Sequence, residues 1–121
     1  MHELSLMAEL IKLVSEDAHD RGIIKVSKID VIVGDLSNVL PEALEEAFIY
    51  LRPRVEALFD EQTELHVIRE EARAACRSCR TEFVPDYRIA FCPVCRLPTS
   101  ELLSGETFRV ESYEGCDEDG N

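Results

Sequence analysis

The feature that most constrains this chain is a set of four cysteines between residues 76 and 95. They form two Cys-x-x-Cys pairs, Cys76 with Cys79 and Cys92 with Cys95, separated by twelve residues. Each pair makes a tight turn that presents two sulfurs at the spacing of a zinc tetrahedron, and a short hairpin would bring the two turns together. Four thiolates close the coordination sphere, so the pattern predicts a structural Zn(II). Free buried cysteines and two redox dithiols are the alternatives.

The cysteine segment also indicates a separate module. Bound zinc would replace the hydrophobic core that about thirty residues cannot build, so we expect residues 72–105 to form an inserted zinc-ribbon-like domain. Zinc knuckles favour glycine just after the second cysteine of a pair, where the backbone takes positive φ. Arg80 and Arg96 stand at these positions. We therefore expect modest backbone strain there, without loss of the site.

The remaining sequence predicts helices and strands from its apolar periodicity. Residues 3–20 place apolar side chains at spacings of three and four, which is typical of an amphipathic helix, with Gly22 as its C-terminal cap. Pro41 suits the first turn of a second helix that Pro53 ends or kinks. Alternating apolar residues predict strands over 23–35, 64–71 and 106–113. The expected fold class is α+β, with two helices on a small three-stranded sheet.

These elements suggest three parts of the chain. Residues 1–71 plus 106–113 form the α+β domain, and residues 72–105 form the inserted zinc-binding domain. Residues 114–121 are acidic and punctuated by glycine, so we expect a disordered tail. Cys116 lies in this tail and is expected to be a free exposed thiol.

The first three residues raise a second possibility of metal binding. The α-amine of Met1, the amide nitrogen and imidazole of His2, and the amide nitrogen of Glu3 can together chelate one metal ion. Four nitrogens in a square plane suit Ni(II) or Cu(II), whereas Zn(II) prefers the thiolates. The alternative is a solvated terminus in which Glu3 only compensates the helix dipole.

Net charge and composition indicate which classes of partner and which compartment this chain is suited to. The formal net charge is −12, which argues against nucleic acid and anionic membranes as partners of the whole chain. No apolar run is long enough to span a bilayer, and Glu3 and Glu9 interrupt any signal-peptide pattern, so we expect a cytoplasmic protein with reduced thiols.

The cysteine segment has a charge of the opposite sign. Residues 72–100 carry five arginines against Glu82 and Asp86, a local charge of +3, with Phe83, Tyr87 and Phe91 among them. This composition motivates an alternative function, a zinc-ribbon binding module for nucleic acid or a transcription complex. Enzymatic activity is not expected, because the zinc site has no open position and the chain has no nucleotide-binding loop or catalytic triad pattern.

The chain contains the motifs MHELSLMAELI, VGDLS, PEALEEAF, the two Cys-x-x-Cys pairs and LLSGETFRVESYE. Together these motifs resemble the HypA/HybF family of nickel metallochaperones for hydrogenase maturation. The resemblance implies exchangeable Ni(II) bound through His2 with nitrogens of Met1 and Glu3, and structural Zn(II) at Cys76, Cys79, Cys92 and Cys95. It also implies delivery to a GTPase accessory protein and to the [NiFe]-hydrogenase large subunit, and some members of the family serve urease accessory proteins.

Overall fold

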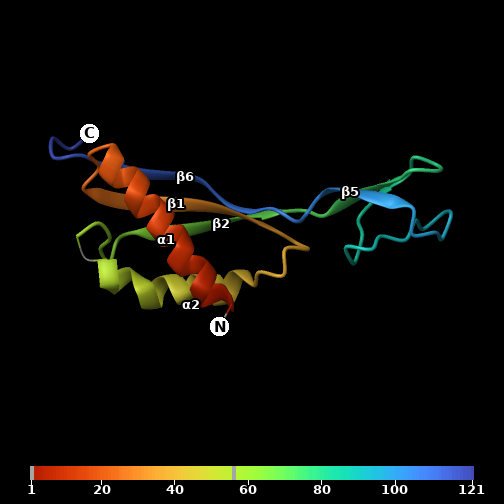
Figure 1. Ribbon diagram of the computed structural model, residues 1–121, viewed down its shortest axis with the longest axis horizontal. Coiled ribbons are helices and arrows are strands. Elements are labelled where there is room, and N and C mark those ends of the chain that lie inside the picture. The colour runs from red at the N-terminus through yellow and green to blue at the C-terminus, as the bar shows by residue number, and fades with distance from the viewer. Residues whose placement is uncertain (1, 56) are drawn as a thin grey trace. The chain divides into compact units, whose positions relative to one another are not determined.

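The computed structural model describes residues 2–55 and 57–121, which form two units (Figure 1). The first unit comprises residues 2–32, 39–55, 57–68 and 109–121, and the second comprises residues 33–38 and 69–108. The elements in chain order are α1 (His2–Asp20), β1 (Lys25–Gly34), α2 (Pro41–Leu51), the 3-10 helix η1 (Arg52–Val55), β2 (Glu64–Glu70), β3 (Arg73–Cys76), β4 (Glu82–Phe83), β5 (Ser100–Ser104) and β6 (Phe108–Cys116).

The helix α1 is the predicted amphipathic helix. Its buried face consists of Met7, Leu10, Ile11, Val14 and Ala18. The helix ends at Asp20, and Gly22 follows with φ of 72°, a left-handed conformation that glycine adopts without steric cost. The amide of Ile23 then donates to the carbonyl of Ala18 at 2.8 Å, which satisfies one of the last helical acceptors.

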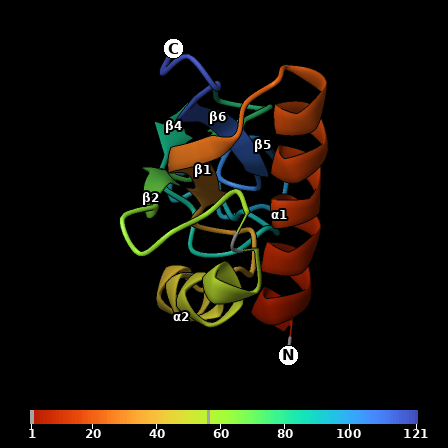
Figure 2. The ribbon, with the colours of Figure 1, turned by 90° about the vertical axis from the view of Figure 1, so that its left-hand side faces the viewer.

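The helix α2 packs against α1, and Figure 2 shows both on the same side of the sheet. Pro41 is its first residue, and η1, which contains Pro53, replaces the α-helix after Leu51. Leu44, Ala47 and Phe48 are its buried side chains. No helix within residues 2–55 and 57–121 is both long and apolar enough to cross a membrane.

The first sheet has the strand order β2-β1-β6, so the three predicted strands pair as expected. Its central strand β1 supplies Ile29 and Val31, which are fully buried. Strand β6 continues to Cys116, three residues beyond its predicted end, because the amide of Ile24 donates to the Cys116 carbonyl at 2.9 Å. Residues 114–116, which the sequence assigns to a disordered tail, therefore belong to the sheet, and Cys116 is half-buried.

The second unit contains its own sheet, in the order β4-β3-β5. Strand β3 is antiparallel to both neighbours, with Ala74 opposite Phe83 on one side and Cys76 opposite Ser100 on the other. The sequence predicted only a short hairpin here. These strands have two to five residues, so they show too little periodicity to be recognised before they pair.

The second unit extends beyond the predicted insertion of residues 72–105. Arg69 donates two hydrogen bonds of 2.7 Å to the carboxylate of Asp35. Glu70 accepts hydrogen bonds from the amides of Gly105 at 2.7 Å and Thr107 at 3.2 Å. These contacts place residues 33–38, 69–71 and 106–108 with the cysteine module in one compact unit.

Replacing Gly105 with alanine is expected to destabilise the second unit by about 2 kcal/mol. Gly105 has φ of 114°, and an added Cβ would lie 2.7 Å from the Cα of Ala72, a contact that only backbone movement relieves. Denaturant unfolding followed by the amide signals of β3 and β5 would measure the loss. Gly120→Ala is the matched control, because Gly120 also has positive φ but has no atom within 4 Å of the added Cβ. Equal effects of the two variants would contradict the steric argument.

Candidate metal centre

The second unit brings the four predicted cysteines together. Cys76 ends β3, Cys79 follows in the next turn, and Cys92 and Cys95 belong to a second turn. All four sulfurs lie within 4.8 Å of one another. Two distances join the two turns, 3.9 Å between the sulfurs of Cys76 and Cys95 and 3.6 Å between those of Cys79 and Cys92.

These distances suit a zinc ion. A tetrahedron with zinc–sulfur bonds of about 2.3 Å has edges of about 3.8 Å, and the two measured distances lie on either side of that value. Cys76 and Cys92 are buried, whereas Cys79 is exposed and Cys95 is intermediate. A metal held here would have protein on one side and solvent near the other.

Both turns have the backbone shape of a zinc knuckle. The amide of Arg80 donates to the carbonyl of Cys76 at 2.8 Å, and the amide of Arg96 donates to the carbonyl of Cys92 at 2.7 Å. Arg80 has φ of 63° and Arg96 has φ of 59°. Both arginines therefore occupy the left-handed region that glycine prefers, which confirms the strain expected from the sequence.

The double variant Arg80→Gly/Arg96→Gly is expected to retain zinc and to stabilise the second unit by about 0.5 kcal/mol. Glycine removes about 1 kcal/mol of left-handed strain at each position, and the greater freedom of the unfolded chain offsets much of that gain. Chemical unfolding of the zinc-loaded protein would measure the difference. Arg77→Gly is the control, since Arg77 has no positive φ and pairs with Glu101 at 3.4 Å. Zinc loss in the double variant would contradict the prediction that glycine at these two positions only relieves backbone strain.

Hydrogen bonds shift the pKa values of three of the four thiols. The backbone amide of Cys79 and other donors lower the pKa of Cys76 to about 6. The hydroxyl of Thr81, 3.1 Å from the sulfur of Cys79, lowers the pKa of that thiol. The pKa of Cys95 rises to about 12, because its thiol donates to the Cys79 sulfur. The donors around Cys76 and Cys79 therefore favour their thiolate forms, which are the forms that bind a dication.

The sequence analysis missed the threonines at this cluster. Thr81 lies beside Cys79, and the hydroxyl of Thr99 lies 3.8 Å from the sulfur of Cys76. Thr81 could have been noticed from its position two residues after Cys79. Thr99 could not, because β5 brings it to β3 from 23 residues away.

The predicted nickel ligands lie in the first unit, and Met1 is outside the described residues. His2 begins α1, and its side chain is 61% exposed. The amides of His2 and Glu3 belong to the first helical turn, where the N–H groups have no carbonyl acceptor in a preceding turn. The Nδ1 atom of His2 lies 3.8 Å from the Glu3 carboxylate.

The carboxylate of Glu3 connects the starts of the two helices, a contact that the sequence did not indicate. It accepts a hydrogen bond of 3.3 Å from the amide of Leu40, the N-cap residue of α2. This bond, with one from the amide of Glu3 itself, lowers the pKa of the Glu3 carboxyl. An ionised carboxylate therefore stands beside the exposed imidazole of His2.

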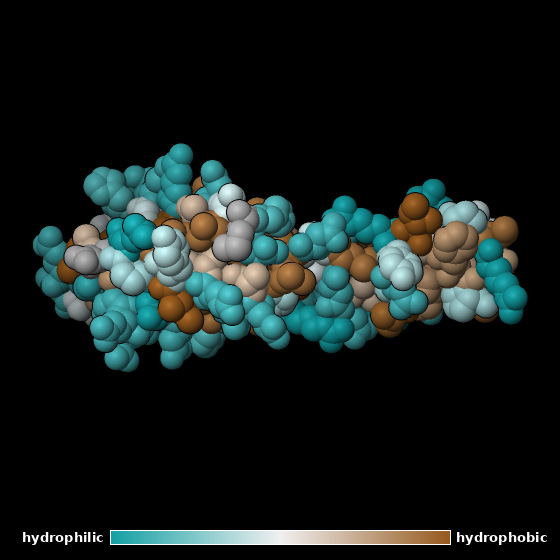
Figure 3. Space-filling model, turned by 90° about the horizontal axis from the view of Figure 1, so that it is seen from below, coloured by the Kyte–Doolittle hydropathy of each residue, from teal (hydrophilic) through white to brown (hydrophobic). Residues whose placement is uncertain are grey.

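Apolar side chains are exposed on the second unit, and Figure 3 shows brown apolar residues among teal polar ones there. They are Val84, Tyr87, Ile89, Phe91, Val94, Leu97 and Leu103. Arg77 and Arg88 are paired with Glu101 and Glu106. The basic surface that motivated a nucleic-acid module is thus partly neutralised by carboxylates.

A family model settles the relationship of this chain. The model, described as hydrogenase/urease nickel incorporation metallochaperone HypA, matches residues 1–115. The chain belongs to the HypA family. Its two helices, small sheets and four-cysteine cluster are therefore those of a family of nickel metallochaperones, and the alternative of a nucleic-acid-binding zinc ribbon is not favoured.

Similar proteins agree with this assignment. The hydrogenase maturation factor HypA of Moorella thermoacetica is 35% identical over 115 residues, covering 95% of this chain and 99% of the relative. HypA of Wolinella succinogenes is 34% identical over 116 residues, covering 94% of each chain. The solution structure of the Ni metallochaperone HypA from Helicobacter pylori matches with a TM-score of 0.65 and 25% identity, covering 96% of this chain and 98% of that one.

Proposed function

We propose that this protein binds Ni(II) through its first three residues and delivers it for maturation of [NiFe]-hydrogenase. The ligands are the α-amine of Met1, the amide nitrogen and imidazole of His2, and the amide nitrogen of Glu3. The observation that carries the proposal is His2 itself. Its imidazole is exposed at the first residue of α1, where neighbouring amides have no helical acceptor.

The proposed donor set accounts for both binding and release. Four nitrogens suit the square-planar preference of Ni(II). Binding to the amide of Glu3 replaces the hydrogen bond between that amide and its own carboxylate. Because His2 is exposed, a recipient protein can approach the metal and replace its ligands one at a time.

Zinc has a different role in this proposal. Cys76, Cys79, Cys92 and Cys95 would hold one Zn(II) in a closed tetrahedral site that gives the second unit its structure. With no open coordination position, this zinc would neither activate water nor exchange readily. We accordingly propose a carrier without catalytic activity, with nickel as cargo and zinc as resident metal.

The domains and partners follow the same proposal. In this proposal the first unit carries the nickel site and the second unit carries the zinc site, and the acidic residues 117–121 follow β6. The partners are a GTPase accessory protein and the hydrogenase large subunit in the cytoplasm, and urease accessory proteins where the cell makes that enzyme. The family description names both hydrogenase and urease.

Extending the chain by two residues tests the proposal directly. A Gly-Ser extension before Met1 moves the α-amine away from His2 and is expected to abolish stoichiometric Ni(II) binding, because the amine is one of the four donors. Isothermal titration of the zinc-loaded protein, with and without the extension, would measure nickel stoichiometry. Undiminished nickel binding by the extended chain would refute the N-terminal site.

A further inference from the structure

Strand β2 (Glu64–Glu70) lies at the edge of the first sheet. It pairs with β1 on one side, and no strand among the described residues lies against its other side. The carbonyl of Glu70 accepts a hydrogen bond from the amide of Asp35, on the β1 side. Since backbone groups alternate in direction along a strand, those of Leu65 and Val67 face outward. Such an edge can pair with another extended chain.

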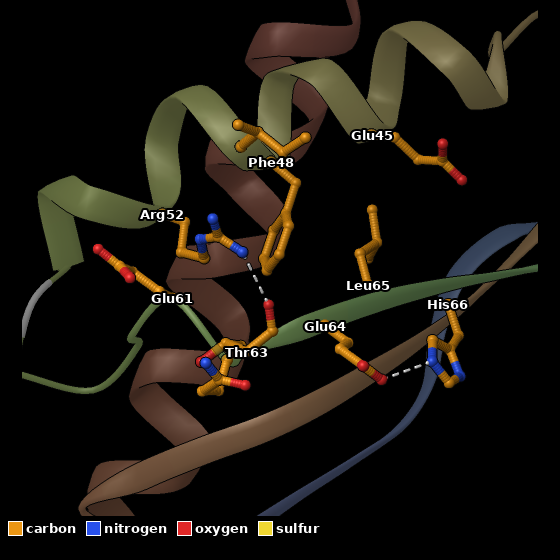
Figure 4. A pocket seen from close by; sticks show the side chains of 10 residues that line it. Glu45, Phe48, Arg52, Glu61, Thr63, Glu64, Leu65 and His66 are labelled. Atoms are coloured by element: carbon orange, nitrogen blue, oxygen red, sulfur yellow. Dashed lines mark hydrogen bonds and ion pairs between the residues drawn. The ribbon is translucent and has the colours of Figure 1, made fainter.

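A groove lies beside this edge, between β2 and α2. Glu45, Phe48, Ile49 and Arg52 line it from the helix side, and residues 61–66 line it from the strand side. Figure 4 shows Leu65 pointing from β2 toward Phe48 on α2. The groove is therefore formed within the first unit alone.

Apolar side chains along the groove and on β2 beyond it are incompletely covered. Ile49 is 58% exposed, and Leu65 and Val67 are only half-buried. By contrast, Ile29 and Val31 on the neighbouring strand β1 are fully buried. An additional strand beside β2 would cover these side chains as well as the backbone edge.

The charges around the groove are mainly negative. Glu45, Glu61 and Glu64 line it. The basic side chains there already have partners: Arg52 donates to the Thr63 carbonyl at 3.1 Å and lies over the Phe48 ring, and the Nε2 atom of His66 lies 3.0 Å from the Glu64 carboxylate (Figure 4). The described residues of the first unit include seven lysines and arginines against seventeen aspartates and glutamates.

We propose that the edge of β2 and its groove bind an extended basic segment of a partner protein as an added strand. Main-chain hydrogen bonds to Leu65 and Val67 would supply the pairing, and an apolar side chain of the segment would contact Ile49. Lysines or arginines on the segment would face Glu45, Glu61 and Glu64. The inference uses neither metal site, so it stands apart from the proposed nickel function.

The same charges disfavour a second copy as the occupant. Two copies paired along β2 would bring acidic first units together, and like charges at an interface oppose association. A basic segment instead gains attraction from that acidic surface. The charge of the surface therefore favours a different, basic protein over a second copy of this chain.

The test uses the full-length, zinc-loaded chain and a defined probe, an acetylated and amidated peptide of alternating lysine and valine. We expect peptide binding to shift the amide signals of the protein mainly in β2 and α2, and we expect added salt to weaken that binding. Glu45→Lys should weaken binding about fivefold at low ionic strength, whereas Glu46→Lys, on an adjacent face of the same helix, should change it little. A peptide with glutamate in place of lysine should not bind.

A backbone variant separates strand pairing from simple charge attraction. Val67→Pro removes an outward N–H and is tolerated at a sheet edge, and it should weaken binding up to about tenfold while the chain stays folded. Shifts confined to other surfaces, no binding by the basic peptide, or equal effects of Glu45→Lys and Glu46→Lys would overturn the proposal. Dimerisation through β2, detected by sedimentation without peptide, would also overturn it in favour of a second copy.

Discussion

Replacing Cys79 with serine is expected to release zinc and to unfold residues 72–105 while the first unit stays folded. Structural zinc contributes about 10–16 kcal/mol to the folding of small domains, and a serine hydroxyl is a poor substitute for a thiolate. The sulfur of Cys79 lies 3.6 Å from that of Cys92, so its removal leaves the cluster with three sulfurs. The expected loss far exceeds that of an ordinary surface substitution.

The small core of this segment explains the size of the effect. Its buried apolar residues are Ala72, Ala74, Cys76, Pro85, Ala90 and Cys92. Three alanines, one proline and two cysteines bury little apolar area, and large side chains such as Ile89 and Phe91 are exposed. Without metal, little remains to offset the chain entropy lost on folding.

Metal analysis and amide spectra would check this expectation. Zinc content should fall from one ion per chain to near zero, and the dispersed signals of β3 and β5 should collapse while those of α1 and β1 persist. Cys116→Ser is the matched control, because it makes the same chemical change in β6, outside the cluster. A Cys79→Ser protein with full zinc content would disprove the four-cysteine site.

Replacing His2 with alanine should eliminate nickel binding and leave zinc and fold intact. Loss of an outer-shell partner already costs about 10–100-fold in metal affinity, so loss of a direct ligand should cost more than about 100-fold. The fold should not change, since the His2 side chain is 61% exposed and its Nδ1 atom lies 3.8 Å from the Glu3 carboxylate, beyond hydrogen-bond distance. The first turn of α1 would keep Glu3 and its bond to Leu40.

His19→Ala provides the control for this variant. His19 lies at the other end of α1 and is exposed, so its removal changes the histidine count without touching the N-terminus. Nickel titration and zinc content, measured side by side on chains that begin with a free Met1, would distinguish the two. Nickel retained by His2→Ala, or lost equally from His19→Ala, would count against the N-terminal site.

Much of the architecture could be predicted from local pattern. The spacing of Met7, Ile11 and Val14 corresponds to one face of α1, and the alternation of Ile29 and Val31 corresponds to the buried side of β1. Positive φ at Arg80 and Arg96 follows from their place after each cysteine pair. These features depend on residues a few positions apart, which is why sequence periodicity reveals them.

Other features depend on distant residues and were not predictable. Strands β3, β4 and β5 exist because they pair across the cysteine module. The bond from Leu40 to Glu3 joins residues 37 positions apart, and the paired hydrogen bonds of Arg69 and Asp35 join residues 34 apart. No periodic pattern in the sequence indicates these contacts, since they form only when the chain closes large loops.

The sequence by itself determined the chemistry of this protein: which side chains can hold a metal, and the turns that hold each cysteine pair. These properties reside in residue type and in spacings of two or three residues. Tertiary structure alone decided that the sulfurs of Cys76 and Cys95 approach to 3.9 Å, that β6 reaches Cys116, and that β2 has a strand on only one side among the residues that the structure describes. Long-range pairing decides these outcomes because the free energy of packing and strand addition is gained only between segments that fold together.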